Sequence, residues 1–333
     1  MRPQTYFSEG RIIGEQRVFA QVPFAANAYY TASMKRKKFL KHTSHIAEAH
    51  RVTKGEKFKL KDFDPGETRG IRSKAIADEM LAQGVGIISE LQEKLYAQDR
   101  WGVLLILQGL DASGKDSAVK HVMSGVNPQG CSVASFKTPS TEELQHDYLW
   151  RVHQKLPERG RIGIFNRSYY EEVLVVRVHK QILQAEKLPE KLISKDIWEE
   201  RYEDINAFEK YLARNGLLIL KVFLYLSKEE QARRFLKRVE EPEKNWKFSV
   251  SDIQEREYWK DYHAAYEEMI QNTSKKHAPW FIAPADNKWF AHLVIASAII
   301  EGLEGLELKY PEVRKKEKAE LENVRKLLLA EKH

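Results

Sequence analysis

The residues best suited to chemistry in this 333-residue chain gather in a glycine-containing turn at residues 109–117. Gly109 and Gly114 are separated by four residues and followed by Lys115, which is the G-x-x-x-x-G-K core of a phosphate-binding loop. Glycines let successive backbone N–H groups point at phosphate oxygens, and the helix expected after the loop adds its N-terminal dipole. The predicted phosphate-binding residues are Gly109, Ala112, Ser113, Gly114 and Ser117, with Lys115 as a catalytic charge on a bridging or terminal phosphate. The alternative is a chance match, expected in roughly one chain of this length in ten.

Two carboxylates distinguish this loop from the usual pattern. Asp116 stands where Ser or Thr normally holds magnesium, and Asp111 lies inside the loop itself. Carboxylates beside phosphates repel them unless a hard divalent cation lies between. Asp111 and Asp116 are therefore predicted to be catalytic residues and metal ligands. Mg²⁺ is the expected cofactor, with Mn²⁺ as the alternative.

Five short apolar runs indicate the fold class. The run 103–107 reads as a buried strand that leads into the loop, and the others cover residues 132–136, 162–165, 217–226 and 280–283. Helical stretches separate them, so the pattern predicts βαβ units and an α/β fold with a mainly parallel five-stranded sheet covered on both faces. Ligands bind beyond the carboxyl ends of such strands, where the loop, Lys137 and Asn166 all fall. Lys137 is accordingly a predicted phosphate-binding residue.

A second polar cluster follows the strand at 162–165. Asn166 occupies the position where a magnesium-supporting carboxylate usually lies in a phosphate-loop enzyme. Arg167 is suited to bidentate contact with a phosphoryl oxygen and is predicted to be catalytic. Glu171 and Glu172 have the chemistry to accept a proton or to bind a nucleotide hydroxyl. Their alternative is an ordinary helix N-terminal turn, where the dipole favours acids.

The segment at about 228–250 carries the highest density of cations near the predicted site. Arg233 with Lys237 and Arg234 with Arg238 form two i,i+4 pairs on one predicted helix. Like charges at this spacing destabilise a helix by roughly a few tenths of a kcal/mol per pair. We interpret the segment as a lid whose four cations bind phosphates and exclude water. The alternative is a solvated face whose cations pair with the acidic residues four positions earlier.

Composition limits the wider interpretation. One cysteine excludes an intramolecular disulfide and fits a reducing compartment, and no apolar stretch is long enough for a membrane span. A cytoplasmic protein without a membrane partner is expected. The net charge is +7, yet residues 1–62 alone carry +8, notably in the run 35–38. Such a run attracts polyanions, and its alternative is a solvated arm.

Between about His50 and Leu306 the chain resembles the polyphosphate kinase 2 family. The resemblance depends mainly on residues 109–116, Gly-Leu-Asp-Ala-Ser-Gly-Lys-Asp, and 165–171, Phe-Asn-Arg-Ser-Tyr-Tyr-Glu. Residues 242–248 and 284–289 give weaker support. The stretch 169–171, Tyr-Tyr-Glu where other subgroups have Trp-Tyr-Asn, is similar to the class III branch. That branch is associated with both nucleoside mono- and diphosphates as acceptors.

The resemblance implies a P-loop kinase-like three-layer fold, magnesium, and a homo-oligomer, either a dimer or a tetramer. It also implies transfer between inorganic polyphosphate and nucleotides, with adenine as the expected base and guanine as the alternative. Asn166, Glu171, Glu172 and Arg177 are the predicted nucleotide-binding residues. The expected organisation is a basic extension at 1–45, a phosphotransferase domain at 46–308 that carries the lid, and a charged C-terminal helix or tail at 309–333.

The sequence thus favours a magnesium-dependent enzyme that moves a terminal phosphoryl group of polyphosphate onto AMP or ADP, reversibly. Two alternatives stay open. One is an ATP-dependent nucleoside monophosphate kinase, which the same fold and lid would serve. The other is a non-enzymatic polyanion or nucleic-acid binder, which leaves Asp111 and Asp116 unexplained because acids repel polyanions. Nucleic acid is therefore not expected as a partner.

Overall fold

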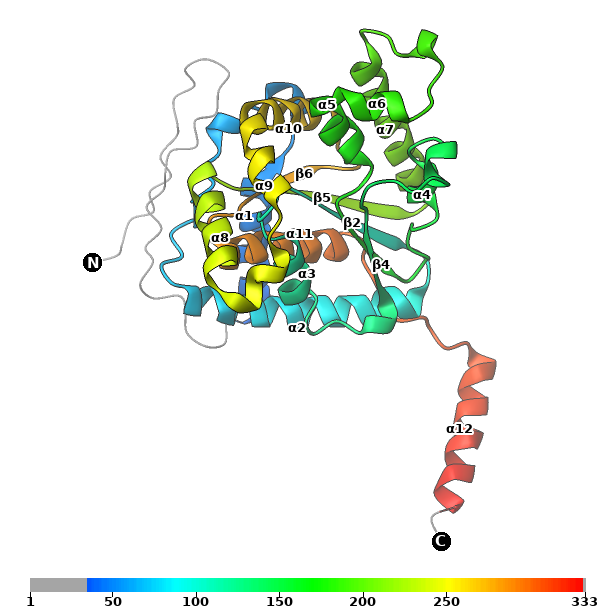
Figure 1. The fold of residues 1–333 in the computed structure, drawn as a ribbon. Coiled ribbons are helices and arrows are strands. Elements are labelled where there is room, and N and C mark those ends of the chain that lie inside the picture. The colour runs from blue at the N-terminus through cyan, green and yellow to red at the C-terminus, as the bar shows by residue number, and fades with distance from the viewer. Residues whose placement is uncertain (1–34, 332–333) are drawn as a thin grey trace, which may run out of the picture.

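The computed structural model describes residues 35–331, whose centre is a six-stranded sheet in the order β1-β6-β5-β2-β4-β3 (Figure 1). The strands are β1 (Arg51–Val52), β2 (Gly102–Gln108), β3 (Cys131–Ser135), β4 (Ile162–Asn166), β5 (Leu217–Tyr225) and β6 (Trp280–Pro284). The last five are the predicted strands, and all of their pairings are parallel. The predicted count of five was one too low. β1 joins β6 antiparallel, and two residues are too few to show an alternating pattern.

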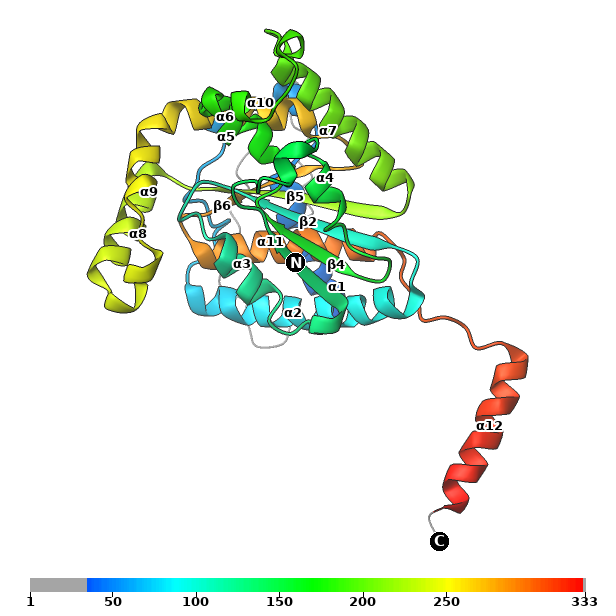
Figure 2. The ribbon, with the colours of Figure 1, turned by 45° about the vertical axis from the view of Figure 1, so that its right-hand side comes forward.

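Helices cover both faces of this sheet (Figures 1 and 2). One face carries α1 (Arg36–His50), α2 (Lys74–Gln98), α3 (Lys115–Val122) and α11 (Lys288–Glu304). The other carries α7 (Ile197–Arg214) and α10 (Trp259–Thr273), together with the 3-10 turn Tyr169–Val173. The predicted α/β class with a sheet between two helical layers is confirmed.

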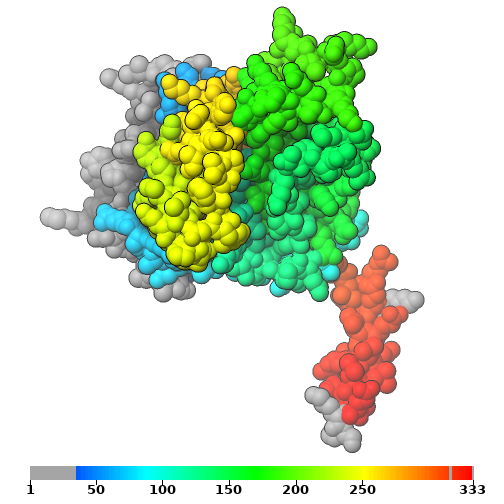
Figure 3. Space-filling model, in the orientation of Figure 1, coloured from blue at the N-terminus to red at the C-terminus, as the bar shows by residue number. Residues whose placement is uncertain are grey.

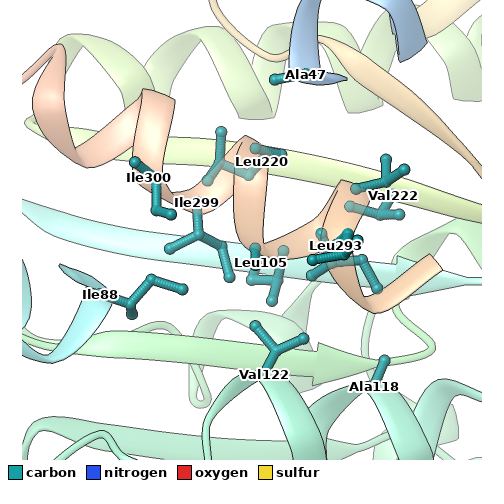
Figure 4. Packing of buried hydrophobic residues seen from close by; sticks show 14 of the residues in the cluster. Ala47, Ile88, Leu105, Ala118, Val122, Leu220, Val222, Leu293, Ile299 and Ile300 are labelled. Atoms are coloured by element: carbon teal, nitrogen blue, oxygen red, sulfur yellow. The ribbon is translucent and has the colours of Figure 1, made fainter. Parts of the chain in front are cut away.

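Alternate residues of β2 enter different halves of the core, as the two-residue period of a strand requires. Leu105 packs toward α2, α3 and α11, where Ile88, Val122 and Ile299 surround it (Figure 4). Leu104 belongs to the cluster on the opposite face. Burial on both sides explains why the strand is a continuous apolar run.

Helix α1 begins inside the segment that was expected to be an extension. Its Phe39, Ile46 and Ala47 are buried in the core cluster that also contains α11, so the expected boundary at residue 45 falls within a packed helix. The lysine run at 35–38 concealed this apolar stripe. Residues 1–34 lie outside the described part of the chain, and the domain boundaries remain predictions. At the other end, α12 (Lys315–Ala330) stands away from the domain (Figures 1 and 2).

The lid segment consists of α8 (Lys228–Glu240), the 3-10 turn Pro242–Lys247 and α9 (Val250–Gln254). The remaining helices are α4 (Trp150–His153), α5 (Val175–Val178) and α6 (Lys180–Ala185). The other 3-10 turns are Gly55–Lys57, Leu60–Asp62, Pro128–Gly130, Glu143–Gln145, Glu190–Leu192 and Glu255–Tyr258. Within residues 35–331, no helix has the length and apolarity needed to cross a lipid bilayer.

Candidate active site

The loop predicted to bind phosphate connects β2 to α3, at the carboxyl edge of the sheet. Gly109 has φ 156°, and a Cβ there would lie 2.7 Å from the Ser113 Oγ and 2.9 Å from the Leu224 carbonyl oxygen, so only glycine fits. Gly114 has φ 108°, and Ala112 also takes a left-handed conformation at φ 65°. Lys115 lies folded over the loop, because its Nζ donates to the carbonyl oxygens of Gly109 at 2.6 Å and Leu110 at 3.3 Å.

Arg167 links two carboxylates at the mouth of this loop. Its Nη2 donates to the Asp111 Oδ1 at 2.6 Å, and its Nη1 donates to the Glu171 Oε2 at 3.1 Å. Arg167 itself has φ 64°, a strained conformation for a residue with a long side chain. Burial opposes the ionisation of Asp111, but the charges of Lys115 and Arg167 outweigh it and hold the pKa of Asp111 below its ordinary value. Asp111 is therefore an anion, as a metal ligand must be.

The second predicted metal ligand lies beside the end of β4. The Asn166 Nδ2 donates to the Asp116 Oδ1 at 2.6 Å, so the loop and β4 meet through these two side chains. Within the described residues, no group of three or more His, Cys, Asp or Glu side chains could hold a metal ion. Asp111 and Asp116 thus provide two carboxylate side chains, one fewer than such a group requires.

The four lid cations do not share one role. Arg234 is almost buried, with 8% of its side chain exposed. Its Nη1 donates to the carbonyl oxygens of Ala112 at 2.8 Å and Ser113 at 3.0 Å, and its Nη2 donates to the carbonyl oxygens of Ala285 and Asp286. Arg234, which was expected to bind phosphate, therefore donates its hydrogen bonds to backbone carbonyl oxygens, including two in the phosphate-binding loop. We conclude that Arg234 fixes the loop against the end of β6.

Among the other lid cations, only Arg238 lines the cavity described below. Its Nη1 donates to the Asp252 Oδ2 at 2.8 Å. Arg233 and Lys237 are exposed, and Arg233 pairs with Glu230 one turn earlier on α8. Both residues lie as the alternative of a solvated face expects, and Arg233 has an acidic partner; their role in phosphate binding stays a prediction.

A cavity of about 1250 Å³ runs from the phosphate-binding loop to the segment around α5 and α6. In Figure 3 the lid, in yellow, and the green segment face each other across a hollow. The loop end is lined by Asp111, Ala112, Lys115, Asp116, Lys137, Asn166, Arg167, Glu171 and Arg238. The far end combines polar and apolar side chains, namely Tyr148, Arg151, Glu172, Val175, Val176, Ile182, Glu186, Leu188, Ile197 and Arg201. The volume exceeds that of a typical small-molecule site, so the cavity has room for more than one ligand.

At the far end, one arginine serves two carboxylates. Arg201 donates through Nη1 to the Glu172 Oε2 at 2.7 Å and through Nη2 to the Glu186 Oε2 at 2.5 Å. Burial, and then the neighbouring Glu186, raise the pKa of Glu172 to about 8. The positive charges of Arg201 and Arg151 oppose this increase but do not cancel it. Sequence reasoning missed Arg201 and Glu186, since nothing local to residues 186–201 indicates that they face a cavity.

Two predicted residues lie elsewhere. Arg177 donates to the Tyr202 hydroxyl at 2.9 Å and pairs with Glu268, and it does not line the cavity, so its nucleotide-binding role stays a prediction. Ser117 directs its hydroxyl at the His292 Nε2, 3.3 Å away, and also lies outside the cavity lining. The preceding residue, Asp116, lines the cavity instead of Ser117.

A phosphate-binding loop, paired carboxylates, an arginine between them and a cationic lid together define a P-loop phosphotransferase. Residues 72–311 match the sequence model of the family described as Polyphosphate kinase 2. The chain belongs to the polyphosphate kinase 2 family.

Individual relatives agree with this assignment. The chain is 50% identical over 280 residues to an ADP-polyphosphate phosphotransferase of Rhodopseudomonas palustris, covering 84% of this chain and 97% of the relative. It is 44% identical over 264 residues to an AMP/ADP-polyphosphate phosphotransferase of Meiothermus ruber, covering 79% and 95%. The crystal structure of Polyphosphate Kinase 2 from Arthrobacter aurescens TC1 matches with a TM-score of 0.77 at 38% identity, covering 84% of this chain and 96% of that one.

Proposed function

We propose that this enzyme transfers a phosphoryl group between inorganic polyphosphate and AMP or ADP, reversibly. The observation that carries the proposal is the cavity that joins the phosphate-binding loop to a far end lined by both polar and apolar side chains. Polyphosphate has no base, so a polyphosphate kinase needs one nucleoside chamber, whereas an ATP-dependent nucleotide kinase needs two. The names of the Rhodopseudomonas palustris and Meiothermus ruber relatives support the donor and the acceptors.

The residues at the loop end have distinct tasks in this proposal. Lys115 and the loop amides bind phosphate oxygens, and Arg167 neutralises charge on the group in transfer. Asp111 orients the acceptor phosphate, which it does through its position beside Arg167. Phosphoryl transfer depends mostly on positioning and charge stabilisation, so no covalent nucleophile is required.

The donor set at this end fits a divalent cation. Asp111 and Asp116 would hold it, and Asn166, already hydrogen-bonded to Asp116, would accept a bond from one of its waters. Two carboxylates suit Mg²⁺, which keeps several waters and takes further oxygens from substrate phosphates. When bound, the cation would supply positive charge that offsets the charge of the phosphate oxygens. Mg²⁺ is the proposed ion, with Mn²⁺ as the alternative.

Glu171 supports acceptance of both AMP and ADP. Its carboxylate, 15% exposed, lines the cavity and pairs with Arg167, so we expect an acceptor phosphate or ribose to bind beside it. We therefore expect the same enzyme to convert AMP to ADP and then ADP to ATP. The predicted homo-oligomer and the preferred base remain predictions.

The test supplies AMP and Mg²⁺ with either polyphosphate or ATP as donor, and resolves the nucleotides by ion-exchange chromatography over time. We expect ADP and then ATP to form from polyphosphate. Glu171→Asn should change the AMP-to-ADP preference more than the KM for polyphosphate. Phosphorylation of AMP from ATP alone would instead identify a nucleoside monophosphate kinase.

A further inference from the structure

A fully buried ion pair lies beneath the site, on the face covered by α7 and α10. The Lys221 Nζ, from the central strand β5, lies 2.7 Å from the Glu209 Oε2 of α7, and both side chains are 0% exposed. Lys221 also donates to the Thr273 carbonyl oxygen and to the Tyr170 hydroxyl, each at 2.8 Å. Its three protons are therefore all used. The only local signal in the sequence is a lysine inside the apolar run 217–226.

The same carboxylate anchors two adjacent tyrosines. The Tyr169 and Tyr170 hydroxyls donate to the Glu209 Oε1 at 2.8 and 2.6 Å. Both rings are buried, and their centroids lie 4.9 Å apart. The hydroxyls of Tyr169 and Tyr170 thus both bond to one ion pair, which is buried and out of reach of any substrate.

Stability alone gives no reason to retain such a pair. Replacing a buried ion pair with apolar side chains of similar volume is often neutral or stabilising, because removing two charges from water is unfavourable. The centroid of the Trp280 ring lies 5.2 Å from the Lys221 Nζ, and Trp280 belongs to the buried hydrophobic cluster of this face. We therefore look for a second role of this ion pair, and its hydrogen bonds to the two tyrosines indicate which part of the molecule it affects.

The tyrosines separate the two partners of the catalytic salt bridge. Arg167 precedes them by one intervening residue, and Glu171 follows them directly, within the turn Tyr169–Val173. The intervening Ser168 is fixed as well, since its Oγ accepts from the Gln108 Nε2 at 3.1 Å and from the Tyr170 backbone N–H at 3.2 Å. In so short a segment, movement of either ring is transmitted to the guanidinium and to the carboxylate.

We propose that Glu209 and Lys221 are positioning residues, which hold Tyr169 and Tyr170 so that Arg167 stays between Asp111 and Glu171. The inference rests on the proposed function, in which Arg167 neutralises the phosphoryl group in transfer. It also accounts for the left-handed backbone at Arg167, since strain of this kind persists only where the surroundings enforce it.

The main test replaces the pair with apolar residues, in the double variant Glu209→Leu/Lys221→Met. We expect a cooperatively folded protein whose Tm is unchanged or higher. Its kcat should fall by roughly tenfold to a hundredfold, since a displacement on the order of 1 Å has that effect on rate. KM for polyphosphate and for AMP should stay within about threefold, because the binding residues remain. The conservative variant Glu209→Gln/Lys221→Met keeps an oxygen for the hydroxyls and should recover most of kcat.

If the apolar variant does not fold, Tyr169→Phe/Tyr170→Phe leaves the ion pair intact and should show the same loss of kcat at constant KM. Wild-type kcat in either folded variant would overturn the inference. Hydrogen exchange gives a readout that needs no turnover: amides at 167–174 should exchange faster in the variants, while those of α2 do not. Unchanged protection at 167–174 would overturn the positioning role even if the wild type transferred no phosphate, a result that would refute the proposed function separately.

Discussion

Arg238 should contribute to donor binding far more than the neighbouring cations of α8. It alone of the four lid cations lines the cavity, and its side chain is 20% exposed. Two unit charges 5 Å apart interact by about 3 kcal/mol at an effective dielectric constant of ~20. Solvent and the competing ion pair with Asp252 reduce this to roughly 1.5 kcal/mol, close to a tenfold effect. Arg238→Ala should therefore raise the KM for polyphosphate by about tenfold.

The matched control is Arg233→Ala, on the same helix. Arg233 is 72% exposed and pairs with Glu230, so its loss should change the KM for polyphosphate by less than about twofold. Asp252→Asn provides a test of opposite sign, because it frees the Arg238 guanidinium and should lower that KM. Both comparisons require only that the lid retains its fold, which circular dichroism can check.

The assay measures initial rates against polyphosphate concentration at two ionic strengths, with saturating ADP. The wild type should lose affinity steeply as salt screens the cations, and Arg238→Ala should lose less. KM for ADP should change little. Equal effects of Arg233→Ala and Arg238→Ala, or none from either, would refute the assignment of Arg238 to the donor path.

Three further changes follow from the geometry. Arg234→Ala removes the donors that fix the loop carbonyls, so both kcat and Tm should fall. The free energy of unfolding, measured by denaturation, should decrease by roughly 1–3 kcal/mol. An unchanged Tm would contradict the conclusion that Arg234 fixes the loop. Lys115→Ala should lower turnover by about a hundredfold or more, on the order of 3 kcal/mol, with cooperative melting retained; wild-type rates would refute the site. The pKa of Glu172 is raised to about 8 from the 4.5 of the unfolded chain, so the folded protein retains a proton that the unfolded chain releases. Stability should fall from pH 4.5 to 8, on the order of 3 kcal/mol, and Glu172→Gln should flatten that dependence; identical curves for both proteins would disprove the retained proton.

The sheet was predictable because its strands carry their own signal. Five apolar runs became five parallel strands, since burial on both faces demands continuous apolar sequence. β1 was not predictable, because its two residues pair with β6 through tertiary contact alone. α1 escaped notice for another reason. Its buried Phe39 lies between Lys38 and Lys41, and the charge of this basic stretch dominates the local composition.

The candidate site also contains residues that could be predicted from the sequence and residues that could not. The placement of Gly109, Gly114 and Lys115 between β2 and α3 was predictable from spacing, since one short loop contains the whole motif, and phosphate binding by this loop stays a prediction. Arg234 and Arg238 could not be told apart, because i,i+4 spacing places them on one face of α8. Which of them reaches the cavity depends on how α8 lies against the loop and against Asp252, contacts that join residues 14 to 122 positions apart.

The charges explain why an anion-binding site contains so many acids. Without substrate, Arg167 is held by Asp111 and Glu171, Arg238 is held by Asp252, and Lys115 lies on loop carbonyls. These partners keep the cations in place while no phosphate is bound, so little side-chain ordering is left for the binding step. When phosphates bind, their oxygens replace the carboxylate and carbonyl oxygens that contact each cation in the absence of substrate. The displaced carboxylate of Asp111 would then be free to hold, with Asp116, the divalent cation proposed above. A purely basic site would lack these internal partners, so its cations would have to be ordered when the substrate binds.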